Sequence, residues 1–186
     1  RYDIMGPFRM FPAMECRHSV FSLRHRLDGR VRLNGQTLCF DEGVGYVEGD
    51  RGRSFPGRYA WTQASDAHAR RAVMVSVADI PYLGLRFRGC IAVALVDGRQ
   101  YRLATYKGVR VARCAPDGLI LRQGRLTLTA QRLDGAVGQG LRAPVSGAMG
   151  RIIHENAACP MRFGLWEGGR QRLDLICPRA SYEYVT

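Results

Sequence analysis

Several features that define common classes of protein are missing from this sequence of 186 residues. The longest apolar run, residues 90–96, has the length of a buried strand, whereas a membrane-spanning helix needs ~20 apolar residues. The six cysteines are too widely spaced for the CxxC pairs of zinc and redox sites. No phosphate-binding loop, nucleophile elbow or dinucleotide fingerprint is present. We therefore expect neither a metal site nor a cofactor.

Lysine is almost absent, although the chain is strongly basic. Arginine and lysine together number 28 against 16 acidic residues, a formal charge of +12, and Lys107 is the single lysine. The arginines are spread along the chain, with Arg70 and Arg71 as the longest contiguous run. Nucleic-acid-binding segments cluster their basic residues. We therefore expect many of the arginines to face solvent and nucleic acid not to be a partner, with an anionic membrane surface as a weaker alternative.

The positions of the cysteines indicate whether the protein is in a reducing or an oxidising compartment. Cys39, Cys90 and Cys177 lie within apolar stretches, where thiols behave as small hydrophobic side chains. We expect these thiols to be buried and reduced. A reduced state favours a cytoplasmic location, with peripheral membrane association as the alternative.

Apolar residues alternate with polar ones along most of the chain, which is the pattern of half-buried strands. Hairpin signals separate these runs at Asn34-Gly35, Asp97-Gly98 and Asp117-Gly118. Only residues 65–71 and 135–147 are expected to be irregular or helical. The pattern predicts an antiparallel all-β domain of about ten to twelve strands over residues 1–186, either a β-barrel or a packed sandwich. It leaves open whether the interior is filled by side chains or holds an apolar ligand.

One segment, residues 43–63, breaks this alternation. It is rich in glycine and interleaves aromatic with ionisable side chains: Tyr46, Phe55, Tyr59 and Trp61 with Glu48, Asp50, Arg51 and Arg53. This composition indicates a partly buried network in which guanidinium groups pair with carboxylates. The network is either a structural clamp for a long loop or part of a functional site. Upstream, His18 and His25 fall on opposite faces of an extended strand, so they do not form a two-histidine metal pair.

Parts of the sequence resemble the tocopherol cyclase family and its bacterial relatives. Residues 45–56, followed by 59–63, resemble the family motif Y-x-E-x-(D/N)-W-G-x-x-F-P…W-x-Q, with Gln63 as its last residue. The flanking segments 5–18, 143–155 and 180–185 resemble the bacterial branch. The motif's tryptophan is replaced by Arg51, which we expect to hold Asp50 ionised.

The resemblance implies a calycin-type, lipocalin-like β-barrel that corresponds to the C-terminal half of a longer protein with two β-rich halves. The N-terminal half of that parent protein is then an expected partner, and a hydrophobic small molecule the expected ligand. Plant members of the family close a chromanol ring on a prenylated quinol. By this resemblance Glu48 is the candidate acid, Asp50 with Arg51 and Arg53 the orienting network, and His18 a proton shuttle. Ligand contacts are expected from Tyr46, Arg51, Arg53, Phe55, Tyr59, Trp61 and Gln63.

Three classes of function remain open from the sequence. The first is an enzyme that cyclises, hydrates or isomerises a prenylated or isoprenoid molecule by acid catalysis. The second is a non-catalytic carrier of a hydrophobic ligand, in which Arg51 and Arg53 fully neutralise Glu48 and Asp50. The third is a basic module that binds nucleic acid or an anionic membrane, which requires a contiguous arginine face.

Overall fold

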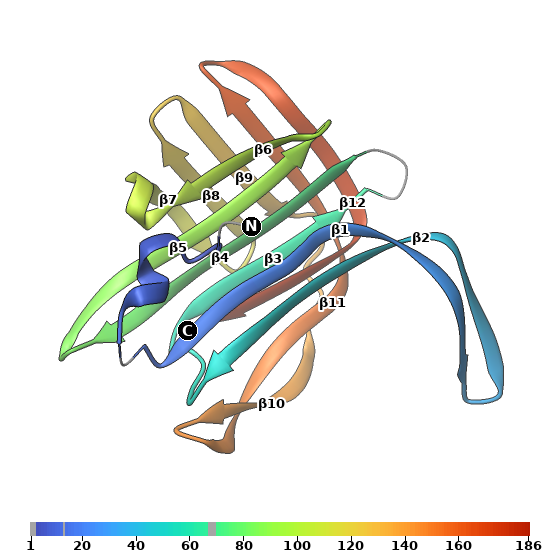
Figure 1. Ribbon diagram of the computed structural model, residues 1–186, viewed down its shortest axis with the longest axis horizontal. Coiled ribbons are helices and arrows are strands. Elements are labelled where there is room, and N and C mark those ends of the chain that lie inside the picture. The colour runs from blue at the N-terminus through green and yellow to red at the C-terminus, as the bar shows by residue number, and fades with distance from the viewer. Residues whose placement is uncertain (1–2, 13, 67–69) are drawn as a thin grey trace.

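The computed structural model describes residues 3–12, 14–66 and 70–186, most of which lie in antiparallel strands (Figure 1). Two short 3-10 helices, η1 (Gly6–Met10) and η2 (Thr105–Lys107), accompany twelve strands in these ranges. The strands are β1 (Cys16–Leu33), β2 (Gln36–Gly52), β3 (Tyr59–Ser65), β4 (Arg71–Tyr82), β5 (Leu85–Val96), β6 (Arg99–Ala104), β7 (Arg110–Ala115), β8 (Gly118–Gln123), β9 (Leu126–Arg132), β10 (Gln139–Val145), β11 (Ala148–Glu167) and β12 (Arg170–Val185). The predicted all-β class and number of strands are confirmed.

Ten strands form one sheet in the order β6-β5-β4-β3-β12-β11-β9-β8-β7, with β10 paired to β11. Strands β1 and β2 form a separate two-stranded hairpin. The hairpin turns at Asn34-Gly35 and Asp97-Gly98 are where the sequence predicts them, and all four residues have positive φ. Residues 139–145, expected to be irregular, instead form β10, whose backbone pairs with β11. Residues 67–69 of the other stretch expected to be irregular lie outside the described residues.

The main sheet curls so that one of its faces encloses the core. On β4, Val73, Val75 and Val77 point into this core with strands β8, β9, β11 and β12, whereas Met74 belongs to a separate apolar cluster on the other face. Large buried side chains such as Phe163 and Tyr182 fill the interior. The inside of the curled sheet is therefore a packed core, which answers the question that the sequence leaves open.

The path of paired strands does not close into a complete barrel, because β6 and β7 end it without pairing to each other. The closed barrel expected from the sequence is corrected in this respect. A side chain of β8, the strand next to β7, bonds to β6 instead. Gln123 Oε1 accepts from the Ala104 N–H at 2.9 Å, and Gln123 Nε2 donates to the Arg102 carbonyl at 3.1 Å. The Gln123 amide thus replaces one backbone rung between β6 and β8.

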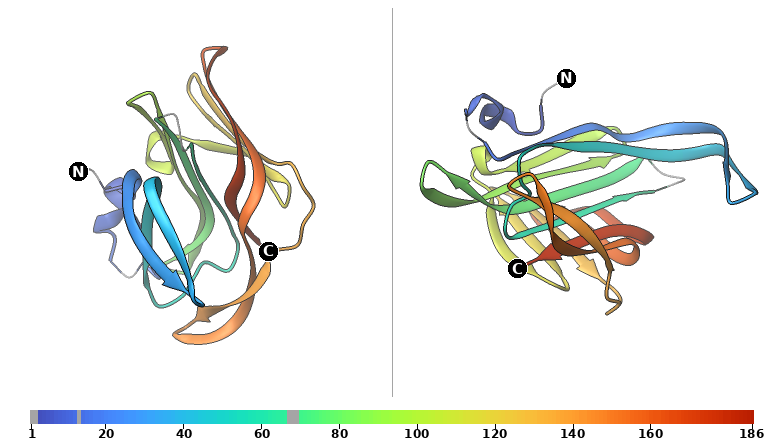
Figure 2. Two further views of the ribbon diagram at one scale, coloured as in Figure 1. Left: turned by 90° about the vertical axis from the view of Figure 1, so that its right-hand side faces the viewer. Right: turned by 90° about the horizontal axis from the view of Figure 1, so that it is seen from below.

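The β1–β2 hairpin lies against the outer face of the curled sheet and extends beyond it (Figure 2). Val20 and Leu23 of β1 and Tyr46 of β2 pack on the apolar cluster that includes Met74 and Val93. This outer layer covers β3, β4 and β5 and creates a second enclosed region apart from the core.

None of the six cysteines forms a disulfide. Cys90, Cys159 and Cys177 are buried, whereas Cys39 lies exposed on the hairpin, so the expectation that Cys39 is buried is wrong. The physical reason is that the far half of the hairpin packs on no other element, so its apolar alternation does not imply burial. Within the described residues, no helix is long and apolar enough to cross a membrane.

Candidate functional site

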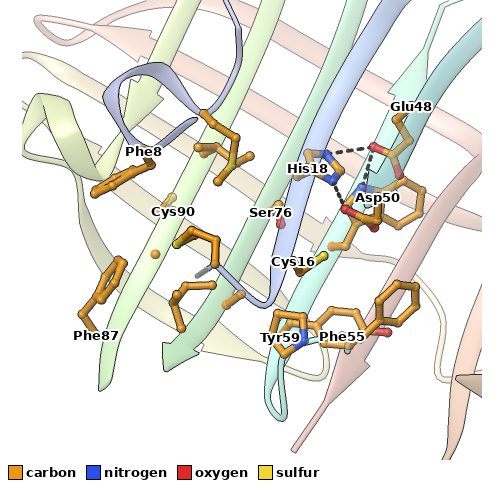
Figure 3. Close-up of a pocket in the computed structure, with 18 of the residues that line it drawn as sticks. Phe8, Cys16, His18, Glu48, Asp50, Phe55, Tyr59, Ser76, Phe87 and Cys90 are labelled. Atoms are coloured by element: carbon orange, nitrogen blue, oxygen red, sulfur yellow. Dashed lines mark hydrogen bonds and ion pairs between the residues drawn. The ribbon is translucent and has the colours of Figure 1, made fainter. Parts of the chain in front are cut away.

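A cavity of about 140 Å³ lies between the outer face of the main sheet and the β1–β2 hairpin (Figure 3). Its floor comes from β3, β4, β5 and β12, and η1 with the segment after β2 completes its wall. His18, Glu48 and Asp50 face one another on one side, and Phe8 and Phe87 lie on the other (Figure 3). The lining is mostly apolar: Met5, Phe8, Met14, Cys16, Phe55, Pro56, Tyr59, Trp61, Ala78, Ile80, Phe87, Gly89, Cys90 and Ile91, with Ser76, His18, Glu48, Asp50 and Glu183 as the other members.

Strand pairing brings the polar side chains together. His18 of β1 lies directly opposite Asp50 of β2, and the neighbouring pair on the same face joins Val20 to Glu48. Because side chains alternate across a strand, Tyr46, Glu48 and Asp50 share the face of β2 that looks toward the main sheet. His18 Nδ1 lies 2.9 Å from Asp50 Oδ1, within hydrogen-bond distance.

Glu48 is the acceptor at the centre of this network. Its Oε2 accepts hydrogen bonds from the phenol of Tyr46 and from the indole Nε1–H of Trp61, the latter at 3.1 Å. His18 Nε2 lies 3.2 Å from the same oxygen, which is an ion-pair distance, although the angle does not satisfy a hydrogen bond. Glu48 Oε2 is therefore already engaged as the acceptor of two side-chain hydrogen bonds.

The two carboxylates keep His18 charged. Burial on its own would lower the pKa of His18, whose side chain is only 12% exposed. The hydrogen bond to Asp50 and the contact with Glu48 outweigh burial and raise the pKa to about 9. At neutral pH the cavity wall therefore carries one imidazolium between two carboxylates, a net charge of one negative.

A second polar pair lies on the sheet side of the cavity. Tyr59 of β3 donates a hydrogen bond from its phenol to Glu183 Oε2 of β12 at 2.7 Å. Burial raises the pKa of Glu183 above its ordinary value, the bond from Tyr59 lowers it, and the neighbouring carboxylates of Glu155 and Glu48 raise it further. The raised pKa makes Glu183 a candidate proton donor within the cavity.

Two thiols line the cavity, those of Cys16 and Cys90. Burial, together with the charge of Asp50, raises the pKa of Cys16 to about 12, and burial raises the pKa of Cys90 to about 12. Both thiols therefore stay protonated at neutral pH. In the described part of the chain, no group of three or more His, Cys, Asp or Glu side chains is arranged to hold a metal ion.

Most of the site residues predicted from the sequence gather at this cavity. His18, Glu48, Asp50, Phe55, Tyr59 and Trp61 line it, and Tyr46 is bonded to Glu48. Gln63 does not line it, because this side chain donates to Ser181 Oγ at 3.2 Å, farther along β3. A ligand role for Gln63 remains a prediction.

The expected pairing of Arg51 and Arg53 with Glu48 and Asp50 is wrong. Arg51 lies on the opposite face of β2 from Asp50, since adjacent side chains of a strand point to opposite sides, and Arg53 follows the end of β2. Both arginines are exposed and neither lines the cavity. His18 takes the place that the sequence analysis assigned to the guanidinium groups.

Sequence reasoning missed Glu183 and the aromatic wall of Phe8 and Phe87. Glu183 stands between Tyr182 and Tyr184 in the closing strand, an ionisable residue among aromatic ones, which is the same signal that singled out Glu48. Phe8 and Phe87 gave no such signal, because their proximity depends on the way η1 folds over β5.

A comparison with known proteins finds a solved structure with a similar fold. No model of a known protein family matches the sequence, and no curated protein matches it. Among solved structures, kievitone hydratase from Nectria haematococca is similar, with a TM-score of 0.52 over 92% of this chain and 14% sequence identity. The match covers 53% of the hydratase chain, so this chain spans about half the length of that protein. At this identity the similarity concerns the fold, and membership of the tocopherol cyclase family remains a prediction.

Proposed function

We propose that this protein binds an unsaturated apolar small molecule, such as a prenylated phenol, and adds water or the molecule's own hydroxyl across its double bond. The observation that carries this proposal is the position of Glu183. A carboxyl with a raised pKa faces the same apolar cavity as the His18–Glu48–Asp50 network, which carries a net negative charge. A proton source and a stabilising site for the resulting cation are therefore present in one cavity.

The reaction follows from the charges of these groups. Glu183 gives its proton to one alkene carbon, and the π electrons of the double bond form the new C–H bond, which leaves a tertiary carbocation. The faces of Tyr59 and Trp61 and the net negative charge of the His18–Glu48–Asp50 network stabilise this cation. Water, or a phenolic oxygen of the same molecule, then forms the C–O bond. Asp50 accepts the proton released from that oxygen, and exchange with solvent restores Glu183.

This assignment moves the role of acid from Glu48 to Glu183. An alkene carbon is a weak base, so a carboxylic acid is a better donor to it than an imidazolium with a pKa of about 9. Glu48 already accepts hydrogen bonds from Tyr46 and Trp61 and forms an ion pair with His18. We therefore assign Glu48 and His18 to orientation and charge stabilisation.

Two further observations support an enzyme over a carrier. The carrier hypothesis requires Arg51 and Arg53 to neutralise the cavity carboxylates, and these arginines are on the other side of the hairpin. The fold is also shared with a protein whose name describes a hydratase. Fold similarity is a weak argument for activity, so the weight rests on the cavity.

Turnover of 2-(3-methylbut-2-enyl)phenol tests the proposal, because its two products differ in mass. Addition of water gives a tertiary alcohol, and attack by the phenol gives an isomeric chroman. We expect Glu183→Gln to lower the rate by about 100-fold or more while the affinity for the phenol is unchanged. Glu42→Gln, which makes the same change on the exposed hairpin, serves as the control and should retain the rate. If Glu183→Gln turns over at the rate of the parent, Glu183 is not the proton donor.

A further inference from the structure

A second hollow lies next to the cavity, on the solvent-facing side of the β1–β2 hairpin. It is lined by Met14, Arg17, Arg51, Gly52 and Arg53. Met14 lines both the cavity and this hollow, so the two lie next to each other. Three guanidinium groups are therefore close to the apolar cavity.

These arginines form no ion pair with a carboxylate of the described residues. Arg17 and Arg51 are directly opposite each other on β1 and β2, an arrangement in which like charges destabilise a sheet. In the part of the chain that the structure describes, no carboxylate forms an ion pair with Arg17, Arg51 or Arg53, and Glu15 beside them is no exception. An anion bound in the hollow would offset this repulsion.

The hollow is held in place by backbone contacts. The Arg17 guanidinium donates to the carbonyls of Arg9 and Phe11. The Arg53 N–H donates to the Glu15 carbonyl at 2.8 Å, and the Arg53 carbonyl accepts from Gly147 at 2.8 Å. The Arg17 guanidinium and the backbone of Arg53 are thus fixed before any ligand arrives, which lowers the entropy cost of binding.

The size of the cavity indicates that a ligand extends beyond it. A cavity of about 140 Å³ is comparable to one of roughly 150 Å³ that holds a benzene molecule. A group about the size of one prenyl chain or one aromatic ring therefore fills this volume, and a larger molecule extends from it.

We propose that Arg17, Arg51 and Arg53 form a subsite for the anionic group, a carboxylate or a phosphate, of a small amphiphile whose apolar end occupies the cavity. This inference rests on the proposed function for the use of the cavity and adds the chemical class of the substrate. Asp50 does not repel the anion strongly, because it faces the other side of β2 and is bonded to His18.

Calorimetric binding of two matched compounds tests the subsite. 4-Hydroxy-3-(3-methylbut-2-enyl)benzoate carries a carboxylate, and its methyl ester has nearly the same shape without the charge. We expect the acid to bind at least about tenfold more tightly than the ester at low salt, and this preference to shrink at high salt. Geranyl phosphate and geraniol form a second pair, which distinguishes a phosphate subsite from a carboxylate subsite.

The variant R51Q/R53Q should abolish the preference for the anion and leave the affinity for the ester unchanged. The matched control is R110Q/R122Q, which removes two arginines that also lie opposite each other on β7 and β8, away from the cavity. The control should retain the preference, because the net charge is equal in the two variants.

The other possible results distinguish failure of the anion subsite from failure of the proposed function. Equal affinity for acid and ester, and for geranyl phosphate and geraniol, in the parent protein overturns the subsite and leaves the proposed function intact. If no probe binds at all, the proposed function fails together with the subsite. If acid and ester bind equally while R51Q/R53Q abolishes flotation with phosphatidylglycerol vesicles, the arginines face a membrane and the small-molecule subsite is wrong.

Discussion

His18 is the residue on which the polar side of the cavity depends, because it is the cation between two carboxylates. Its hydrogen bond to Asp50 comes from cross-strand pairing, and its contact with Glu48 comes from the next position along the same face. The same geometry that charges His18 also keeps Glu48 and Asp50 from repelling each other. Replacement of any one of these three residues should therefore change the electrostatic environment of the other two.

Asp50→Asn should lower the pKa of His18 from about 9 toward the ordinary value of 6.5. The hydrogen bond to Asp50 is the strongest influence that raises this pKa, and an amide supplies no compensating charge. Proton NMR titration of the imidazole measures the change. An unchanged pKa in Asp50→Asn would show that another group holds the charge on His18.

The raised pKa of His18 also predicts how stability depends on pH. Because the folded pKa of about 9 exceeds the ordinary value of 6.5, the stabilisation is fully present below pH 6.5 and is lost as pH rises toward 9. The shift corresponds to roughly 3 kcal/mol at most. We expect urea unfolding of the parent to show this loss between pH 6 and pH 10, and His18→Gln to lack it.

The sequence predicts which residues of β2 share a face, but it does not predict which residue of β1 they contact. Alternation along β2 groups Tyr46, Glu48 and Asp50 on one face without any structure. The same alternation places Arg51 on the opposite face from Asp50, which is why the two side chains do not pair. The contact of His18 with Asp50 depends on the register of β1 against β2. That register contains bulges, which alternation alone does not predict.

At the scale of elements, the open end of the β1–β2 hairpin is the junction on which both the cavity and the arginine hollow depend. Cys16 pairs with Gly52 there, and the chain then diverges toward Met14 and Arg53. A Cβ at Gly52 would lie 1.9 Å from the Glu15 carbonyl oxygen, which is backbone and cannot rotate away. Only glycine permits this approach of the two strands.

Gly52→Ala should therefore separate the strand ends and destabilise the protein by about 1–3 kcal/mol, the range usual for overpacking. Gly57→Ala is the matched control, since a Cβ there meets no atom within 4 Å. Thermal unfolding compares the two variants. Equal midpoints for Gly52→Ala and Gly57→Ala would mean that the strand ends open without cost.

At the scale of the whole molecule, the curled sheet has a filled interior and carries its cavity on the outside. The sequence predicted the strands and most of their turns because these are local signals. It did not predict that β1 and β2 leave the sheet to cover its outer face, because that packing joins residues distant in the chain. For the same reason, the sequence left open whether the interior is filled.

The Gln123 side chain links β6 to β8 across the open side of the sheet. Gln123→Met keeps the length of Gln123 but leaves the buried Ala104 N–H and the Arg102 carbonyl without partners. An unsatisfied buried group costs about 1–3 kcal/mol, so we expect a loss of that order in the free energy of unfolding. Gln131→Met, on the exposed side of β9, should change little. Equal effects of both variants would show that β6 does not need the bridge.

The proposed reaction begins when Glu183 donates a proton to an alkene carbon of the ligand. Deuterium labelling tests this step directly. The parent protein is incubated with 4-hydroxy-3-(3-methylbut-2-enyl)benzoate in D₂O, and the product is analysed by NMR and mass spectrometry. We expect a chroman or a tertiary alcohol with one deuterium bound to carbon, and no such product from Glu183→Gln. Failure to form either product, or a product without carbon-bound deuterium, would contradict the account.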